Sequence, residues 1–315
     1  MSEKIFQYLN VIKKAVELIE AELTSVAPDP KSILNHQIQT MQSVTTEVSP
    51  VPEAGDNPDY LKARNKHVMD LMAIDCWPKA VVDYVDKTPT EIEQKKRAKI
   101  IIDSSIQKPI EGASVLDIGC ADGWTTSDIM QRGAASVYGF DVIKHDRWNY
   151  LTGPQYTTDY SVIPNDFFDI VLMYDVLDHC EDAERTMQLA LSSLKKSGTV
   201  YVRCHPWTSR HATHLYKQGI NKAYLHLFLS WSEIRSLTEA TPIFTRQEQN
   251  AVEAYRWWFR DFNIVAERFT RETVSDFFKN PAFKELIANE QHIQDIDAYL
   301  QLMEIQFVDY VITPK

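Results

Sequence analysis

Residues 113–129, ASVLDIGCADGWTTSDI, contain the turn that decides the fold. A short apolar run ends at a turn that carries Gly119 and Gly123, and a helical segment follows. A dinucleotide-binding turn of the pattern G-x-G-x-x-G would need glycines where this chain has Ala121 and Trp124. The turn therefore fits a pyrophosphate poorly, although its two glycines still allow a tight bend and a close backbone approach to a ligand.

Asp117 indicates the chemistry of that ligand. Its carboxylate precedes Gly119 by two residues. A carboxylate repels a phosphate and attracts an ammonium group. We therefore predict that this loop, with Cys120 in it, binds a ligand that has a cationic amino-acid end.

Further apolar runs at residues 136–141, 168–175 and 198–206 alternate with helical segments. Buried runs that alternate with helices are typical of a parallel sheet with helices on both faces. Two more strand-like runs follow at residues 262–269 and 305–314, and the insertion between them, residues 271–300, is predicted to be helical. Ligands of such sheets bind at the carboxyl ends of the strands, so the residues after each run are informative.

Acidic residues occur at these informative positions. Asp141 lies 22 residues past Gly119, which is the separation typical of an acid that accepts hydrogen bonds from both ribose hydroxyls. Asp159 and Tyr160 precede the run at residues 168–175 and suit an exocyclic amine and a purine ring, with an ordinary turn as the alternative.

The run at residues 168–175 ends in Tyr174 and Asp175, and Val176 follows it. We expect these three residues to face the pocket from the strand tip. Asp178 and His179 follow and are expected to have structural or capping roles. Together, the predicted contacts require a ligand with an amino-acid end, a ribose and an adenine. S-adenosylmethionine (SAM) has all three.

On these residues the chain resembles the class I, Rossmann-like SAM-dependent methyltransferases, over about residues 90–315. The family's first motif is matched by VLDIGCADGWTT, with Ala121 in place of the middle glycine. Its fourth-strand motif is matched by FDIVLMYDVLDHCED, with Asp178 in place of the usual Glu. LSSLKKSGTVYVRCHP is similar to the family's following motif, with Ser197 where the first glycine often stands.

The resemblance implies an α/β fold: a Rossmann-like, seven-stranded, mostly parallel sheet with an antiparallel last strand. The runs at residues 262–269 and 305–314 would then form an antiparallel pair. It also implies SAM as the cofactor. The residues it assigns to SAM are Asp117, Gly119 and Gly123 at the methionine and ribose end, Asp141 at the ribose, Val142 and Asp159 at the adenine, and Tyr174 at the methionine side.

The segment after the run at residues 198–206 is the candidate for the acceptor side. Within twelve residues it has three histidines, which we predict to be catalytic together with Asp175, and three side chains predicted to contact the acceptor. The histidines are His205, His211 and His214, and the contacts are Trp207, Arg210 and Tyr216. A polar surface loop with incidental histidines is the alternative. The histidine spacing also suits a metal ion, but no carboxylate accompanies it, so we predict no metal.

Two aromatic segments have two interpretations each. YRWWFR, residues 255–260, would either stack a base or a sugar or pack in the core. The segment around Trp77, AIDCWPKAV, would either form a lid over the cofactor or simply pack on the core.

The chain divides by composition into four parts. Residues 1–25 contain a helix, residues 3–24, with apolar residues at heptad spacing, which either packs on its own domain or serves self-association or docking. Residues 26–59 are a proline-rich linker. Residues 60–112 are a helical lid or cap, in which Thr90 and Glu93 form a capping-box pattern. Residues 113–315 are the predicted SAM-binding methyltransferase domain.

Composition limits the choice of partners and compartment. The net charge of −11 argues against coating long nucleic acids, although it does not exclude a local basic patch. The four cysteines form no CxxC pair, and neither a signal peptide nor a membrane span is apparent, so we expect a cytoplasmic protein. We predict that the protein transfers a methyl group from SAM to oxygen or nitrogen of a small molecule, sugar or nucleotide. We also predict that it forms an oligomer, or docks on a partner, through residues 3–24. The alternative is a catalytically silent assembly component that docks through its N-terminal helix.

Overall fold

The computed structural model describes residues 66, 69–74, 77–83, 85, 87–180, 182–212, 214–229, 233–234, 237, 255–256, 258–272 and 296–315. All of them belong to one compact unit, Asn65–Lys315. The predicted helix at residues 3–24 and the predicted linker at residues 26–59 lie outside the described residues, as does most of the predicted helical insertion at residues 271–300.

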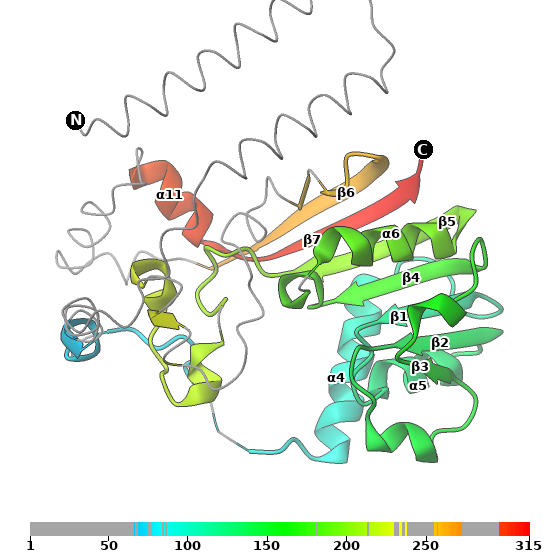
Figure 1. The fold of residues 1–315 in the computed structure, drawn as a ribbon, viewed down its shortest axis with the longest axis horizontal. Helices are drawn as coiled ribbons and strands as arrows, with labels where there is room; N and C mark the ends of the chain where they lie inside the picture. The colour runs from blue at the N-terminus through cyan, green and yellow to red at the C-terminus, as the bar shows by residue number, and fades with distance from the viewer. Residues whose placement is uncertain are drawn as a thin grey trace, which may run out of the picture. The chain divides into compact units, whose positions relative to one another are not determined.

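A seven-stranded sheet organises the described part of the chain (Figure 1). The strand order is β3-β2-β1-β4-β5-β7-β6, and β7 runs antiparallel to β5 and β6 while the other pairs are parallel. The strands are β1 (Ser114–Ile118), β2 (Ser136–Phe140), β3 (Gln155–Thr157), β4 (Phe168–Tyr174), β5 (Leu194–Cys204), β6 (Phe262–Arg271) and β7 (Ile305–Pro314). The predicted Rossmann-like sheet with an antiparallel last strand is confirmed.

Helices cover both faces of this sheet. The α-helices within the described ranges are α4 (Glu91–Ser105), α5 (Trp124–Gln131), α6 (Ala183–Ser193) and α11 (Ile296–Met303). The 3-10 helices are η1 (Asp146–Tyr150), η2 (Tyr160–Val162), η3 (Leu177–His179), η4 (Leu215–Gln218) and η5 (Leu225–Phe228). The predicted capping box is present at the start of α4, where Thr90 and Glu93 cap each other's backbone. None of the described helices combines the length and apolar character that crossing a bilayer requires.

Alternate residues of β4 enter different cores. Val171 and Met173 join the core that α6 covers, whereas Ile170 and Leu172 join the core that α4 and α5 cover. Successive side chains of a strand point to opposite faces. Because both faces are covered, both sets are buried, which explains why residues 170–173 are continuously apolar.

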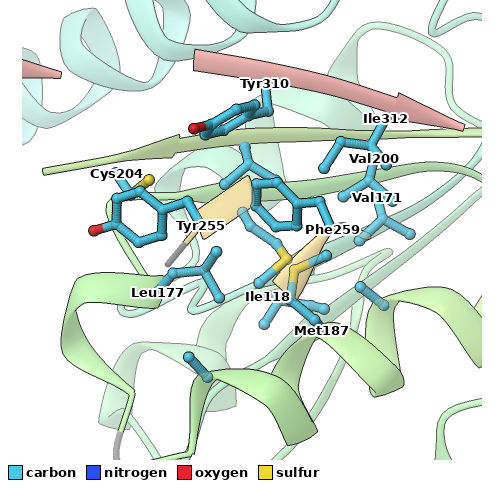
Figure 2. Close-up of a cluster of buried hydrophobic side chains, with 14 of the residues drawn as sticks. Ile118, Val171, Leu177, Met187, Val200, Cys204, Tyr255, Phe259, Tyr310 and Ile312 are labelled. Carbon is cyan, nitrogen blue, oxygen red and sulfur yellow. The ribbon is translucent and has the colours of Figure 1, made fainter. Parts of the chain in front are cut away.

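Figure 2 shows the core on the α6 face. Tyr255 and Phe259 are fully buried there and pack edge-on against Tyr310 of β7, with ring centroids 6.4 and 4.7 Å away. The Tyr255 hydroxyl donates a hydrogen bond to the backbone carbonyl of His205. These two aromatic residues therefore pack in the core rather than offering a stacking surface.

A second apolar core holds the chain that follows β5. It includes Trp207, Leu225 and Phe228, together with Leu71 and Trp77 from the segment before α4. The Trp77 indole nitrogen donates to the backbone carbonyl of Ala223 at 2.6 Å. Trp77 thus packs on the segment after β5, and this packing fixes the segment that carries the predicted acceptor-side residues.

Candidate functional site

The strand order reverses at β1, which pairs with β2 on one side and β4 on the other. An open sheet forms a crevice at such a point, outside the carboxyl ends of the strands. A cavity of about 1170 Å³ lies there. The residues that bound it at the strand ends are Ile118 at the end of β1 with Gly119 after it, Asp141 and Val142 after β2, and Asp175 and Val176 after β4.

The glycine turn after β1 is shaped by two side chains that approach it. Gly119 and Gly123 both have φ of +75°, in the left-handed region. A Cβ on Gly119 would lie 2.4 Å from Val176 Cγ2, and a Cβ on Gly123 would lie 2.6 Å from the Tyr156 hydroxyl. Gly119 borders the cavity and Gly123 does not. Gly123 therefore serves the packing of Tyr156, not a contact with the ligand in this cavity.

Asp117 and Cys120 do not line the cavity. The Asp117 carboxylate is buried and accepts a hydrogen bond from Thr126 Oγ1 at 2.8 Å, which ties β1 to the first turn of α5. Burial raises its pKa to about 7, against the hydrogen bond from Thr126. The Cys120 thiol is also buried, which raises its pKa. The structure thus gives Asp117 a supporting position behind the loop rather than the predicted direct contact with an ammonium group.

Asp141 does face the cavity. One carboxylate oxygen accepts from the backbone nitrogen of Ala121 at 2.9 Å and the other from that of Ile143 at 3.1 Å. A carboxylate has about four acceptor positions, so both oxygens keep capacity for a bound ligand. Ala121 has φ of +44°, in the left-handed region that glycine adopts more readily than alanine.

Beyond Asp141 the cavity wall is apolar and aromatic. Val142 lines it with 80% of its surface exposed, and Tyr160 lines it with the Arg185 guanidinium 4.3 Å from its ring centroid. Asp159 does not line it. Its carboxylate accepts from the backbone nitrogen of Ser161 at 2.8 Å, and the hydrogen bonding with Ser161 lowers its pKa. Asp159 is thus the N-cap of η2, whereas Ser161 is a polar residue that lines the cavity.

The tip of β4 contributes Asp175 and not Tyr174. The Tyr174 hydroxyl accepts from Arg203 Nη1 at 3.4 Å, away from the cavity. Asp175 has φ of +62°, a left-handed conformation that aspartate tolerates better than most residues. This turn directs its carboxylate toward His205, whose Nε2 lies 3.1 Å from Asp175 Oδ1.

The three predicted catalytic histidines form one cluster, in which His205 contacts this carboxylate. Side-chain nitrogens of His205, His211 and His214 all lie within 4.8 Å of one another. None of the three lines the cavity, which is bordered at this end by Asp175 and His179. The tertiary structure therefore brings the histidine cluster together but places it behind Asp175.

Burial determines the charge of these rings. It lowers the pKa of His211 to about 3, of His214 to about 2 and of His179 to about 4, so these imidazoles are neutral near pH 7. His205 differs. Burial opposes its charged form, but the Asp175 carboxylate outweighs burial, and its pKa lies above the ordinary value. Burial alone would raise the pKa of Asp175. The interaction with His205 outweighs burial, so the pKa of Asp175 lies below its ordinary value.

The predicted acceptor contacts do not gather at the cavity. Trp207 is 5% exposed and belongs to the second core. The Arg210 guanidinium contacts the backbone carbonyl of Lys79 and the carboxylate of Glu272, both at 3.1 Å. Tyr216 packs its ring edge-on against His211 and His214. Their positions indicate structural roles for Trp207 and Arg210, and a supporting contact to the histidine cluster for Tyr216.

Sequence reasoning missed several residues that line the cavity. His179 was not assigned to a ligand, and Ser161 and Arg185 were not considered, whereas Val176, expected to face the pocket from the strand tip, lines the cavity. The signal that points to His179 is its place shortly after β4, at the carboxyl edge of the sheet. Arg185 lies in the first turn of α6, where only the fold shows that it reaches Tyr160.

Comparisons with known proteins agree with this architecture. A family model described as a methyltransferase domain matches residues 89–280. A ubiquinone biosynthesis O-methyltransferase of Brucella melitensis is 28% identical over 120 residues, which is 35% of this chain and 48% of that protein. The chain thus spans about half the length of the curated relatives it matches.

Solved structures are similar at a lower level. A SAM-dependent methyltransferase from Mesorhizobium loti has a TM-score of 0.41 and 15% identity, covering 68% of this chain and 95% of that one. A putative SAM-dependent methyltransferase from Listeria monocytogenes has a TM-score of 0.45 and 14% identity, covering 70% and 98%. Scores at this level carry no weight for function. The family assignment comes from the domain match, which spans more than half of the residues, and by it this chain belongs to the class I, Rossmann-like SAM-dependent methyltransferases.

Proposed function

We propose that this protein binds SAM in the cavity at the carboxyl ends of β1, β2 and β4 and transfers the methyl group to an oxygen atom of a small hydroxylated molecule. The observation that carries this proposal is the position of Asp141. Its carboxylate faces the cavity, and each of its oxygens uses only one of its acceptor positions on the backbone amides of Ala121 and Ile143.

The lining of the cavity fits the three chemical parts of SAM. Asp141 suits the ribose hydroxyls, because a carboxylate accepts from both hydroxyls of a cis-diol. Val142, Ile163 and Tyr160 supply apolar and aromatic wall for the adenine, and the Ser161 side chain offers a polar partner beside it. Gly119 allows close backbone approach at the methionine end. The volume of about 1170 Å³ suffices for the cofactor with a small acceptor.

Bound SAM supplies an electrophilic methyl group on a sulfonium. The task of the chain is to align the acceptor with that methyl group and to exclude water. The loop of Gly119 and the side chain of Val176 pack closely and set the inner wall. The acceptor belongs at the Asp175 and His179 end of the cavity, because polar side chains converge there beyond the adenine and ribose positions.

Two observations support an oxygen acceptor on a small molecule. The curated relatives are named O-methyltransferases. The acidic balance of the chain, −11, disfavours a long nucleic acid, while a sugar or a nucleotide remains compatible with it.

Isothermal titration calorimetry of the full chain with SAM tests the binding. We expect one SAM per chain, with competition by the demethylated product, S-adenosylhomocysteine. An absence of binding up to about 1 mM, the upper end of ordinary KM values, would overturn the proposal.

An acceptor screen with methyl-labelled SAM tests the transfer. Panels of phenols, sugars and nucleosides, with matching amines, should show label only on hydroxyl-bearing compounds. Label confined to amines would contradict the oxygen acceptor. Binding of SAM without transfer to any panel member would support the catalytically silent alternative.

A further inference from the structure

The histidine cluster behind Asp175 has a geometry that a hydrogen-bonded ion pair alone does not explain. His205 Nε2 and Asp175 Oδ1 are 3.1 Å apart. Nevertheless, Asp175 Oδ1 is buried and accepts no well-directed hydrogen bond from any described residue. The two atoms are thus close without forming a well-directed hydrogen bond.

His205 is held in the orientation of a metal ligand. Its Nδ1 lies 2.9 Å from the backbone carbonyl of Gln306, and a carbonyl only accepts, so Nδ1 carries a proton and donates. Nε2 is then left for Asp175 and the interior of the cluster. Metal-binding histidines almost always donate their second ring nitrogen to such a partner, which fixes the tautomer. Because His205 is only 2% exposed, this orientation is firmly packed.

His211 and His214 complete the ring of donors. One nitrogen from each lies within 4.8 Å of the others and of His205. His211 Nδ1 is buried and has no hydrogen-bond partner among the described residues. Four ligands around a tetrahedral ion are about 3.3 Å apart when the ion–ligand distance is about 2.0 Å, so small side-chain rotations suffice to close the site.

A second acidic residue adjoins Asp175. Donor atoms of Asp175, Asp178 and His179 lie within 4.8 Å of one another. Asp178 is 1% exposed, and neither of its carboxyl oxygens has a hydrogen-bond partner among the described residues, while its Oδ2 lies 3.4 Å from His179 Nε2. The side of the histidine cluster next to Asp175 is therefore acidic.

We propose that His205, His211 and His214 bind one divalent transition-metal ion, with zinc as its representative, beside the Asp175 carboxylate. The expectation of no metal rested on the lack of a carboxylate in the histidine segment, and Asp175 brings a carboxylate next to this cluster from the end of β4, where its Oδ1 lies 3.1 Å from His205 Nε2. Three imidazoles suit zinc, cobalt and nickel, whereas magnesium and calcium prefer oxygen ligands. Since Asp175 also lines the cavity, the ion would lie at the acceptor end.

This inference goes beyond the proposed methyl transfer and is tested without it. The full chain, made without a polyhistidine tag, is stripped with a chelator and dialysed against zinc or cobalt, with magnesium in excess. Elemental analysis should give about one zinc per chain. Bound cobalt should give the visible absorption bands of a four-coordinate site. An adventitious cobalt ion on the surface would not give these bands.

His211→Ala and His214→Ala should each weaken zinc binding at least about 100-fold, since loss of even an outer-shell partner costs 10- to 100-fold. Asp175→Asn should change the cobalt spectrum. His145→Gln is the matched control, because His145 lies outside the cluster with its Nδ1 3.0 Å from Asp122. Circular dichroism and thermal unfolding of the metal-free variants identify any variant that fails to fold. The zinc binding of the folded variants then tests the proposal.

Metal content near zero after zinc dialysis of the folded wild type would overturn the proposal and leave His205 and Asp175 as an ion pair only. Equal zinc binding by wild type, His211→Ala and His214→Ala would overturn it as well. SAM titration of the same samples separates this failure from a failure of the proposed function, because the predicted SAM contacts at Asp141 and Val142 are not ligands of the ion.

Discussion

The Asp141 carboxylate accepts a hydrogen bond from the backbone nitrogen of Ala121 at 2.9 Å, which ties the loop after β1 to the end of β2. Asp141 therefore orders the loop and faces the cavity at the same time. Any substitution acts on both, so its effect on SAM affinity has to be separated from its effect on folding.

We expect Asp141→Ala to weaken SAM binding by on the order of 1–3 kcal/mol, because charged hydrogen bonds to the ribose are lost. Calorimetry measures the affinity, and thermal unfolding checks the fold. Asp146→Ala is the control, since Asp146 is exposed in η1 and does not line the cavity. An unchanged affinity in Asp141→Ala would show that the ribose binds elsewhere.

Gly119→Ala should destabilise the protein by on the order of 2–4 kcal/mol, from the left-handed backbone and from overpacking against Val176. Gly112→Ala isolates the first cause, because Gly112 has the same φ of +75° and a Cβ added there would meet nothing within 4 Å. Urea unfolding measures both. Adding Val176→Ala to Gly119→Ala should recover part of the loss, and a purely additive double variant would contradict the contact.

Asp117→Asn should change how stability depends on pH. Because the pKa of Asp117 is raised from 3.8 to about 7, the folded state binds a proton more tightly than the unfolded state. This tighter proton binding stabilises the folded state. The stabilisation is fully present below about pH 4 and is lost as pH rises through 7. Asparagine keeps an acceptor for Thr126 and removes the titration.

Relative to wild type, Asp117→Asn should therefore gain stability between pH 5 and pH 8. The gain is about 2–3 kcal/mol, from about two pH units at 1.36 kcal/mol each. Urea unfolding at the two pH values measures it, with exposed Asp146→Asn as control. A pH-independent difference between Asp117→Asn and wild type would mean that Asp117 is ionised throughout.

Trp207→Ala should cost about 3–5 kcal/mol of stability, as expected for removal of a buried aromatic side chain. SAM affinity of the remaining folded protein should be unchanged, since Trp207 does not line the cavity. Tyr150→Ala, at a position 83% exposed, is the control for loss of an aromatic residue. A Trp207→Ala variant with wild-type stability and a raised acceptor KM would restore the substrate role predicted from the sequence.

Deleting residues 1–25 tests the heptad helix, which lies outside the described residues. If this helix associates with a copy of itself, the deletion should lower the mass per particle in light scattering while SAM binding stays the same. Equal oligomeric states of the full chain and the deletion variant would refute the association hypothesis.

The local order of strand, turn and helix was open to prediction because it depends on near neighbours in the chain. The apolar runs predicted β1, β2, β4, β5, β6 and β7, although β5 begins earlier than its run, and Thr90 with Glu93 predicted the start of α4. The spacing from Gly119 to Asp141 likewise placed an acid at the cavity, because consecutive parallel strands end at the same edge of the sheet.

The positions of side chains at that edge depended on contacts between distant segments. The Thr126 hydroxyl donates a hydrogen bond to the buried Asp117, and the Ser161 amide donates one to Asp159, which makes Asp159 a helix cap. Trp207 is buried in the second core. None of these has a periodic signal, because burial and hydrogen-bond partners are decided only when elements pack.

The sequence by itself determined the fold class, the cofactor family and the acid that faces the cavity, because motif spacing and strand order already specify them. Only the tertiary structure decided that Asp175 turns toward His205 and that His205 clusters with His211 and His214. These residues come from the end of β4 and from the loop after β5, and the parallel pairing of the two strands brings their carboxyl ends together.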